Sequence, residues 1–244
     1  MEKDICQRAD DLAKECERKN RITFTSFLTP TEQAEIEQEH YFNLYFYGGL
    51  ESAERKRAFF LPDYIDKETY DFSSFISAFT SKFRFANLSH RDFLGAILNT
   101  GIKRECVGDI YVHEEDVYIL VTKEIAPYLS VNLTKVGRSG IQLKEIHPSE
   151  VRSNEPVYQE RSFTVSSSRL DSVAAGLFQI SREDMAKKIK LGVVMLNYLP
   201  CIDSSKEVHE GDVVSVRGLG KAEIIEFGGT SRSGRVFVIG RRYR

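Results

Sequence analysis

The segment 169–221 constrains the fold most, because it joins two amphipathic helical patterns to short alternating strands. From Leu170 to Phe178, apolar residues recur at the spacing that forms one face of a helix. Ser181 and Asp184 then have the spacing of a capped helix start, with an acid in the positive first turn. Apolar alternation follows and indicates strands. The segment therefore predicts two short helices and a small sheet.

Charge is distributed unevenly along the chain. Residues 161–244 contain 14 Lys and Arg against 9 Asp and Glu, whereas the other 160 residues contain 20 against 27. The C-terminal third therefore has a net charge of +5, and the rest of the chain −7. Lys187 and Lys190 lie on one flank of the second predicted helix. This asymmetry is typical of a protein in which one module faces phosphate.

The same segment resembles the RNA-binding domain named after ribosomal protein S-four, which contains a helix-turn-helix known as the alpha-L motif. The matching residues keep their order and spacing: Arg169-Leu170-Asp171, Ser181-Arg182, Lys187, Lys190-x-Gly192, Val194, Asn197, Gly211-Asp212 and Val216-Arg217-Gly218. The resemblance implies a site that binds RNA. The residues expected at this site are Arg169, Ser181, Arg182, Lys187, Lys190, Asn197, Tyr198, Arg217 and Lys221.

Tyr198 departs from the S-four pattern, in which the asparagine is usually followed by glycine. An aromatic residue at this position argues against a tight glycine turn. Two interpretations of Tyr198 stay open. Its ring offers a stacking surface for a base or ribose, or it packs at the edge of a small core.

Arg182 falls in the first turn of the second predicted helix, where the helix dipole opposes a cation. It gains nothing for the helix there, so we expect a ligand phosphate as its partner. The free amides of the helix start would strengthen such an anion site. Ser181 should cap the helix through its hydroxyl.

Residues 1–72 predict an N-terminal α/β unit. One helix is expected within the first twenty residues, and a second starts at Thr29-Pro30. A strand that ends at Gly48-Gly49 and its return, 57–62, should form a hairpin. The charged segment 51–57 is expected to be its tip.

Residues 73–148 predict the order β-α-β-β-α-β, which is that of ferredoxin-like folds. The expected elements are strands at 75–79 (extending toward Phe85), 108–112, 117–121 and 141–146, and helices from Ser89 and over 123–136. Such a sheet can bind RNA, but the aromatic signature of RNA-recognition motifs is absent. The segment 149–164 is predicted to link this domain to the S-four domain, 165–244. The fold class predicted for the chain is α+β.

With further segments, the chain resembles the bacterial YlmH family over nearly its whole length. They are Gly48-Gly49, 54–58, 89–96, 101–105 and 132–137. The resemblance implies a cytoplasmic, non-catalytic factor that binds rRNA and tRNA on the large ribosomal subunit. Its implied role is in ribosome-associated quality control of stalled peptidyl-tRNA complexes. Arg91, inside one of these segments, is a further candidate RNA contact.

Two other functions stay open. In the first, the acidic residues 1–70 bind a protein partner such as a cell-division component, as the gene neighbourhood of some family members suggests. In the second, RLDSVAAGLF is the box of a pseudouridine synthase and Asp171 is catalytic. Ala174 replaces the threonine of that box, and only 73 residues follow Asp171, too few for that catalytic domain. We therefore expect no enzyme, and Asp171 as a first-turn helix acid.

The four cysteines are scattered and lack the close pairs of a zinc site. They are expected to be free thiols in a reducing cytosol. No apolar run has membrane-spanning length. The sequence therefore predicts no metal, no cofactor and no contact with a membrane.

Overall fold

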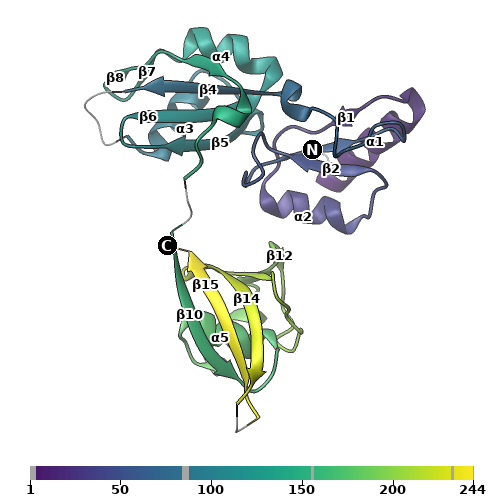
Figure 1. Cartoon of the computed structure of the whole chain (residues 1–244), viewed down its shortest axis with the longest axis vertical. Coiled ribbons are helices and arrows are strands. Elements are labelled where there is room, and N and C mark those ends of the chain that lie inside the picture. The colour runs from purple at the N-terminus through teal and green to yellow at the C-terminus, as the bar shows by residue number, and fades with distance from the viewer. Residues whose placement is uncertain (1–3, 84–87, 155–156, 232–233, 244) are drawn as a thin grey trace. The chain divides into compact units, whose positions relative to one another are not determined.

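The computed structural model describes residues 4–83, 88–154, 157–231 and 234–243. The chain divides into two compact units, residues 1–154 and residues 155–244, called here the N-terminal unit and the C-terminal unit. Both combine helices with antiparallel sheets, as Figure 1 shows. The α+β class is thus observed in each unit.

The N-terminal unit begins with two helices and a three-stranded sheet. The elements are α1 (Ile5–Lys19), β1 (Thr23–Phe24), α2 (Pro30–Gln38), β2 (Leu44–Tyr47) and β3 (Arg57–Phe60), with the strand order β1-β3-β2. The Thr29 hydroxyl accepts from the Glu32 amide, and the Glu32 carboxylate accepts from the Thr29 amide, which makes a capping box. Both predicted helices and the predicted hairpin are confirmed.

A four-stranded sheet follows in the order β5-β6-β4-β9. Its elements are β4 (Ile76–Lys82), α3 (His90–Asn99), β5 (Val107–Val112), β6 (Asp116–Thr122), α4 (Ala126–Asn132) and β9 (Lys144–Ile146), with a small hairpin of β7 (Lys135–Val136) and β8 (Ser139–Gly140). Single 3-10 turns lie at Phe72–Phe75, Arg104–Cys106, Lys123–Ile125 and Pro148–Glu150. The sheet and its two helices have the chain order β-α-β-β-α-β.

Two elements of this region differ from their predicted lengths. The helix expected over 123–136 ends at Asn132, because the chain then turns at Gly137, whose φ is +58°, to form the β7–β8 hairpin. The strand expected over 141–146 is paired only as β9. The expected extension of the first strand toward Phe85 lies outside the described residues.

Both faces of this sheet are packed. One face lies under α3 and α4, and the other contacts Phe27 through a cluster of buried side chains: Ile76, Ala78, Tyr118, Leu120 and Val151. Gly108 lies so close to the ring of Phe27 that a Cβ would come within 2.8 Å of it. The second face therefore belongs to the core of the N-terminal unit and is not an open platform for bases.

Buried arginines hold the two parts of the N-terminal unit together. Arg57 is 3% exposed, and its guanidinium donates to the carbonyls of Thr25 and Phe75 at 2.7 Å each. Arg55 also donates to two backbone carbonyls. The expectation that 51–57 is a charged tip is therefore wrong for Arg57, which is buried, while Arg55 is half-buried; backbone oxygens bond both guanidiniums.

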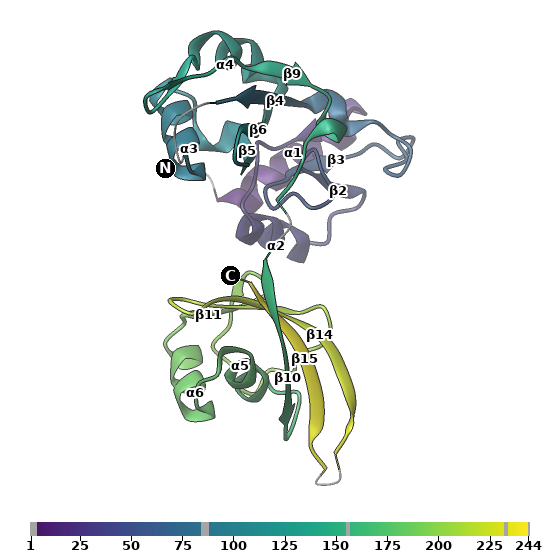
Figure 2. The same cartoon turned by 60° about the vertical axis from the view of Figure 1, so that its left-hand side comes forward.

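The C-terminal unit is one six-stranded antiparallel sheet with two helices. Its elements are β10 (Tyr158–Val165), α5 (Leu170–Phe178), α6 (Arg182–Lys190), β11 (Val194–Leu196), β12 (Leu199–Pro200), β13 (Val213–Val216), β14 (Gly220–Thr230) and β15 (Val236–Tyr243). The strand order is β10-β15-β14-β13-β11-β12. Figure 2 shows α5 and α6 on one face of this sheet, where the core of the unit lies. The two predicted helices are confirmed.

The segment 149–164 differs from the predicted linker. Tyr158–Val165 pairs along its whole length with β15, so the C-terminal part of the segment, from Tyr158 on, belongs to the C-terminal sheet. At the other end, Val151 packs in the N-terminal core. Arg152 donates to the Tyr118 hydroxyl and pairs with Asp116.

Gly240 of β15 provides a test of the contact between α5 and the sheet. A Cβ at this position would lie 2.3 Å from Leu177 Cδ2 and 3.0 Å from the Glu223 carbonyl oxygen. We expect Gly240→Ala to lower the free energy of unfolding by about 1–3 kcal/mol through overpacking. Urea unfolding followed by circular dichroism measures it. Gly229→Ala in β14 is the control, since no atom lies within 4 Å of its Cβ position. Equal stabilities of the two variants would contradict this account of the packing.

Candidate nucleic-acid interface

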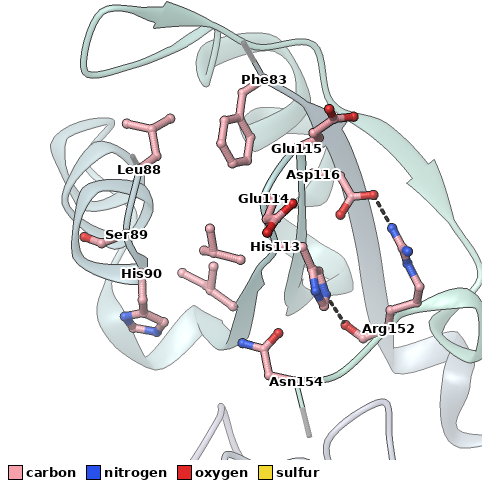
Figure 3. A pocket seen from close by; sticks show the side chains of 12 residues that line it. Phe83, Leu88, Ser89, His90, His113, Glu114, Glu115, Asp116, Arg152 and Asn154 are labelled. Carbon is pink, nitrogen blue, oxygen red and sulfur yellow. Dashed lines mark hydrogen bonds and ion pairs between the residues drawn. The ribbon is translucent and has the colours of Figure 1, made fainter. Parts of the chain in front are cut away.

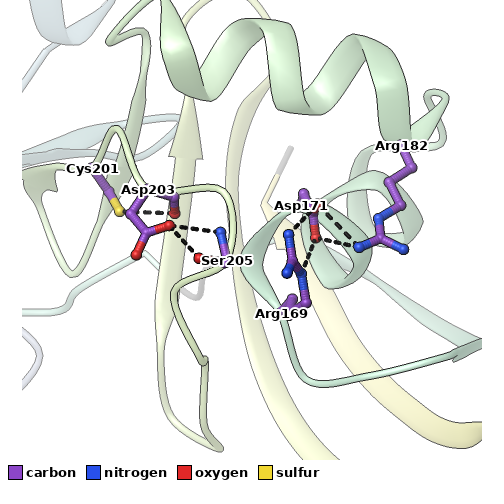
Figure 4. A network of polar contacts seen from close by, with 6 residues as sticks. All are labelled: Arg169, Asp171, Arg182, Cys201, Asp203 and Ser205. Atoms are coloured by element: carbon purple, nitrogen blue, oxygen red, sulfur yellow. Dashed lines mark hydrogen bonds and ion pairs between the residues drawn. The ribbon is translucent and has the colours of Figure 1, made fainter.

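Two arginines meet on one buried carboxylate at the starts of α5 and α6. Arg169 is the residue before α5, Arg182 is the first residue of α6, and Asp171 lies in the first turn of α5. The shortest contact from each guanidinium to the Asp171 carboxylate is 3.1 Å. Figure 4 shows both guanidiniums directed at Asp171. The carboxylate thus fixes two cations at neighbouring helix starts.

Burial differs sharply within this cluster. Asp171 is 5% exposed, whereas the side chains of Arg169 and Arg182 are 40% and 49% exposed. Burial alone would raise the pKa of Asp171, but the hydrogen bonds from the two arginines outweigh it and hold that pKa below its ordinary value. The cluster therefore contains one anion and two cations, with the cations at the surface. Each guanidinium has five N–H donors, so donors remain for a phosphate.

The argument that Arg182 needs a ligand phosphate as its partner is wrong, because Asp171 is a partner within the protein; a phosphate contact at Arg182 stays a prediction. The Asp171 carboxylate offsets the unfavourable dipole at the start of α6. The expectations for the local structure of the two helices are confirmed, whereas RNA binding by Arg169 and Ser181 stays a prediction. Ser181 accepts from the Asp184 amide at 3.0 Å and donates to the Asp184 carboxylate, and Asp171 is a first-turn acid. The left-handed Gly192 follows the end of α6.

The lysines of α6 differ in their surroundings. Lys187 pairs with Glu183 at 2.8 Å and lies 4.0 Å from Asp184. Lys190 is exposed on the same flank. Lys190 is therefore the cation of this pair that is better placed to contact a phosphate.

Asn197 and Tyr198 form the two-residue turn between β11 and β12. Their φ values are +50° and +66°, and Leu196 faces Leu199 across the hairpin. The tight turn that the aromatic residue argued against does form. The Asn197 side chain stabilises it, because it donates to the Asp212 carboxylate and accepts from the Val213 amide at the start of β13. Asn197 is thus a structural residue of the turn. Tyr198 is half-buried, so neither interpretation of its ring is excluded.

The remaining expected residues lie at separate places. Arg217 is exposed beyond β13. The Lys221 ammonium lies 5.9 Å from the Tyr198 ring centroid and 4.6 Å from that of Tyr243. Arg91 is exposed on α3 in the other unit. The residues that the structure brings together are therefore Arg169 with Arg182, and Lys221 with Tyr198.

Three residues near Lys221 were missed from sequence. Arg241 lies 4.9 Å over the Tyr158 ring, and the rings of Tyr158 and Tyr243 are 6.4 Å apart. Burial and a hydrogen bond to Glu223 raise the pKa of Tyr243 to about 12. The spacing of Arg241 and Tyr243, two residues apart in an apolar strand, could have shown that these two side chains lie on one face.

A cavity of about 1000 Å³ in the N-terminal unit has a different character. Figure 3 shows Glu114, Glu115 and Asp116 along its wall, with Arg152 paired to Asp116 and His113 bonded to the Arg152 carbonyl. This acidic wall disfavours phosphate. The cavity is therefore a poor candidate for a nucleic-acid site.

The described ranges of the chain contain no group of three or more metal-ligating side chains. Cys6, Cys16, Cys106 and Cys201 are free thiols. No helix described here has the length and apolar character that a membrane crossing requires.

Comparisons relate the chain to known proteins. Residues 67–150 match the family model described as "Putative RNA-binding domain in YlmH". The chain is 34% identical over 217 residues to "Ribosome-associated protein quality control protein P2" of Bacillus subtilis (strain 168), covering 87% of this chain and 84% of that protein. It is similar to the solved structure of "Cell division protein ylmH from Streptococcus pneumoniae", with a TM-score of 0.52 and 24% identity over 60% of this chain and 91% of that one. At this identity the solved structure informs on the fold alone.

Asp171 should stabilise the C-terminal unit in a pH-dependent way. Its pKa is lowered in the folded state, so its contribution is complete above the ordinary aspartate pKa of about 4 and is lost as pH falls through the folded-state pKa. We expect Asp171→Asn to lower the free energy of unfolding at neutral pH by about 1–3 kcal/mol. Arg182→Ala should cost less, because Arg169 stays bonded. Urea unfolding at neutral and acid pH checks this, and a difference that does not narrow in acid would contradict the role of the ion pairs.

Proposed function

The chain belongs to the YlmH family, and on that premise we propose that it is a non-catalytic RNA-binding factor of ribosome-associated quality control. In this proposal it binds rRNA and tRNA on the large ribosomal subunit when peptidyl-tRNA is stalled, in the cytoplasm. The name of its Bacillus subtilis relative supports the process. The observation that most supports RNA binding is the pair of surface guanidiniums on Asp171.

We assign α5, α6 and the sheet of the C-terminal unit to the S-four type of RNA-binding domain. Two short helices follow each other, with Arg169 just before the first and Arg182 at the start of the second, and β11 to β15 come after them, as in that type. The sheet β5-β6-β4-β9 with α3 and α4 is assigned to the ferredoxin-like class on its strand order. Because that sheet is packed on both faces, we place the main RNA contact in the C-terminal unit.

The chemistry of the Asp171 cluster suits a phosphate backbone. Arginine presents planar, paired donors that match phosphate oxygens, and two such groups held by one carboxylate lose little side-chain entropy on binding. Lys190 and Arg217 add exposed cations in the same unit. The proposed RNA-binding residues are thus Arg169, Arg182, Lys190 and Arg217, with Lys187 in a minor role.

A catalytic role for Asp171 is less well supported. Its carboxylate accepts hydrogen bonds from two guanidiniums, and it is buried. These contacts suit a residue that positions arginines. Conversion of uridine to pseudouridine by the purified protein, abolished by Asp171→Ala, would overturn the non-catalytic proposal.

Binding to ribosomes should depend on the exposed cations in a graded way. We expect Arg182→Ala and Lys190→Ala each to weaken co-sedimentation with the large subunit and to lower the slope of log affinity against log salt by roughly one. Lys187→Ala should have a smaller effect, since Glu183 and Asp184 already neutralise it. Lys14→Ala on α1 is the control for loss of one exposed lysine. Unchanged affinity and slope in Arg182→Ala and Lys190→Ala would move the RNA surface elsewhere.

A further inference from the structure

A row of side chains crosses the C-terminal sheet on the face opposite α5 and α6. Register pairs Tyr158 with Tyr243 and Lys221 with Ser215, and the Lys221 ammonium lies over the Tyr243 ring. Residues next to these in the strands point to the other face: Gly240 contacts Leu177 of α5. The row thus lies on the side of the sheet that the helices do not cover. We call this surface the tyrosine face: Tyr158, Tyr198, Tyr243, Lys221 and Arg241.

The rings and cations of the tyrosine face alternate. Lys221 bridges two rings, with its ammonium 4.6 Å from the Tyr243 centroid and 5.9 Å from that of Tyr198. The Arg241 guanidinium covers Tyr158 at 4.9 Å. Tyr158 is 45% exposed. Three rings and two cations are therefore contiguous along one edge of the unit.

Two carboxylates lie in the next cross-strand row. Glu160 and Glu223 both face Arg241 in register, and the Glu223 carboxylate accepts from the Tyr243 hydroxyl at 2.9 Å. Arg241 is therefore opposed by two carboxylates in register, whereas Lys221 is opposed in register by the neutral Ser215.

The combination of groups discriminates between ligands. The face of an aromatic ring is negative, so a row of rings gives carboxylates of an acidic peptide no attraction. A basic ligand is repelled by the positive charges of Lys221 and Arg241. A polymer with flat bases and phosphates satisfies both kinds of group, since bases stack on rings and phosphates pair with cations.

We propose that the tyrosine face is a second RNA contact, which binds a single-stranded segment by stacking its bases on Tyr158, Tyr243 and Tyr198 around Lys221. It deepens the proposed function and rests on it. It lies on the opposite side of the sheet from the helices that contain Arg182 and Lys190, so the two contacts can fail independently.

The test uses the full chain, fluorescent oligoadenylate as the single-stranded probe and a blunt RNA duplex for comparison. We expect Tyr158→Leu with Tyr243→Leu to weaken oligoadenylate binding by roughly tenfold or more, because each stacked base contributes about 1–3 kcal/mol. The salt slope should stay the same, since no charge is removed. Duplex binding should also be unchanged. Lys221→Met should instead lower the slope.

Controls separate stacking from loss of structure. Tyr158→Phe keeps the ring and should bind as the native chain does. Phe237→Leu removes a ring that is 47% exposed from β15, the strand of Tyr243, and should have no effect on oligoadenylate binding. Circular dichroism confirms that each variant is folded. Arg182→Ala reports on the helix site. If Arg182→Ala loses ribosome binding while the tyrosine variants bind ribosomes and oligoadenylate as the native chain does, this inference is overturned and the proposed function is not.

Two further results would overturn the proposal. One is a folded double leucine variant that binds oligoadenylate as tightly as the native chain. The other is a variant that keeps oligoadenylate binding but loses binding to oligoglutamate, which would make the face a site for acidic peptides.

Discussion

The bond of Asp171 to two guanidiniums determines how the C-terminal unit presents its charge. Without that carboxylate, Arg169 and Arg182 would repel each other at two neighbouring helix starts whose dipoles also oppose them. With it, both are held at the surface by one buried group. A buried acid that serves two cations leaves a net positive charge, which is what a phosphate site needs. The same contact joins the first turns of α5 and α6, so the stability of the unit and the proposed phosphate contact both involve Asp171.

In the N-terminal unit, arginine side chains have a different role. Two of its arginines are directed toward the protein interior: Arg57 is buried and bonded to carbonyls, and the half-buried Arg55 donates to two more. Phe27 packs on the face of the β5-β6-β4-β9 sheet opposite α3 and α4. Because these two cations are directed inward, they add little positive charge to the surface of the unit. The contrast sharpens the charge asymmetry between the two units.

Sequence predicted what depends on local spacing. The caps at Thr29 and Ser181 and the helices they begin follow from periodicity and side-chain chemistry within a few residues. The partner of Arg182 could not be predicted, because Asp171 is eleven residues away along the chain. The two side chains meet only because α5 and α6 pack with their first turns close together. The burial of Arg57 was missed because charged residues are usually exposed. Cross-strand rows were missed because register is a property of pairing between distant strands.

The backbone of the turn at Asn197 and Tyr198 gives a separate argument for the proposed tyrosine face. A side chain in left-handed backbone costs about 1–2 kcal/mol relative to glycine, and Tyr198 has a φ of +66°. Glycine would form the same turn without that cost. The strain is offset in part by the two bonds of the Asn197 side chain to Asp212 and Val213, but those bonds do not need a ring at the next position. What the ring adds is its approach to Lys221. A strained residue whose side chain reaches a cation shared with Tyr243 is better explained by ligand binding than by turn stability.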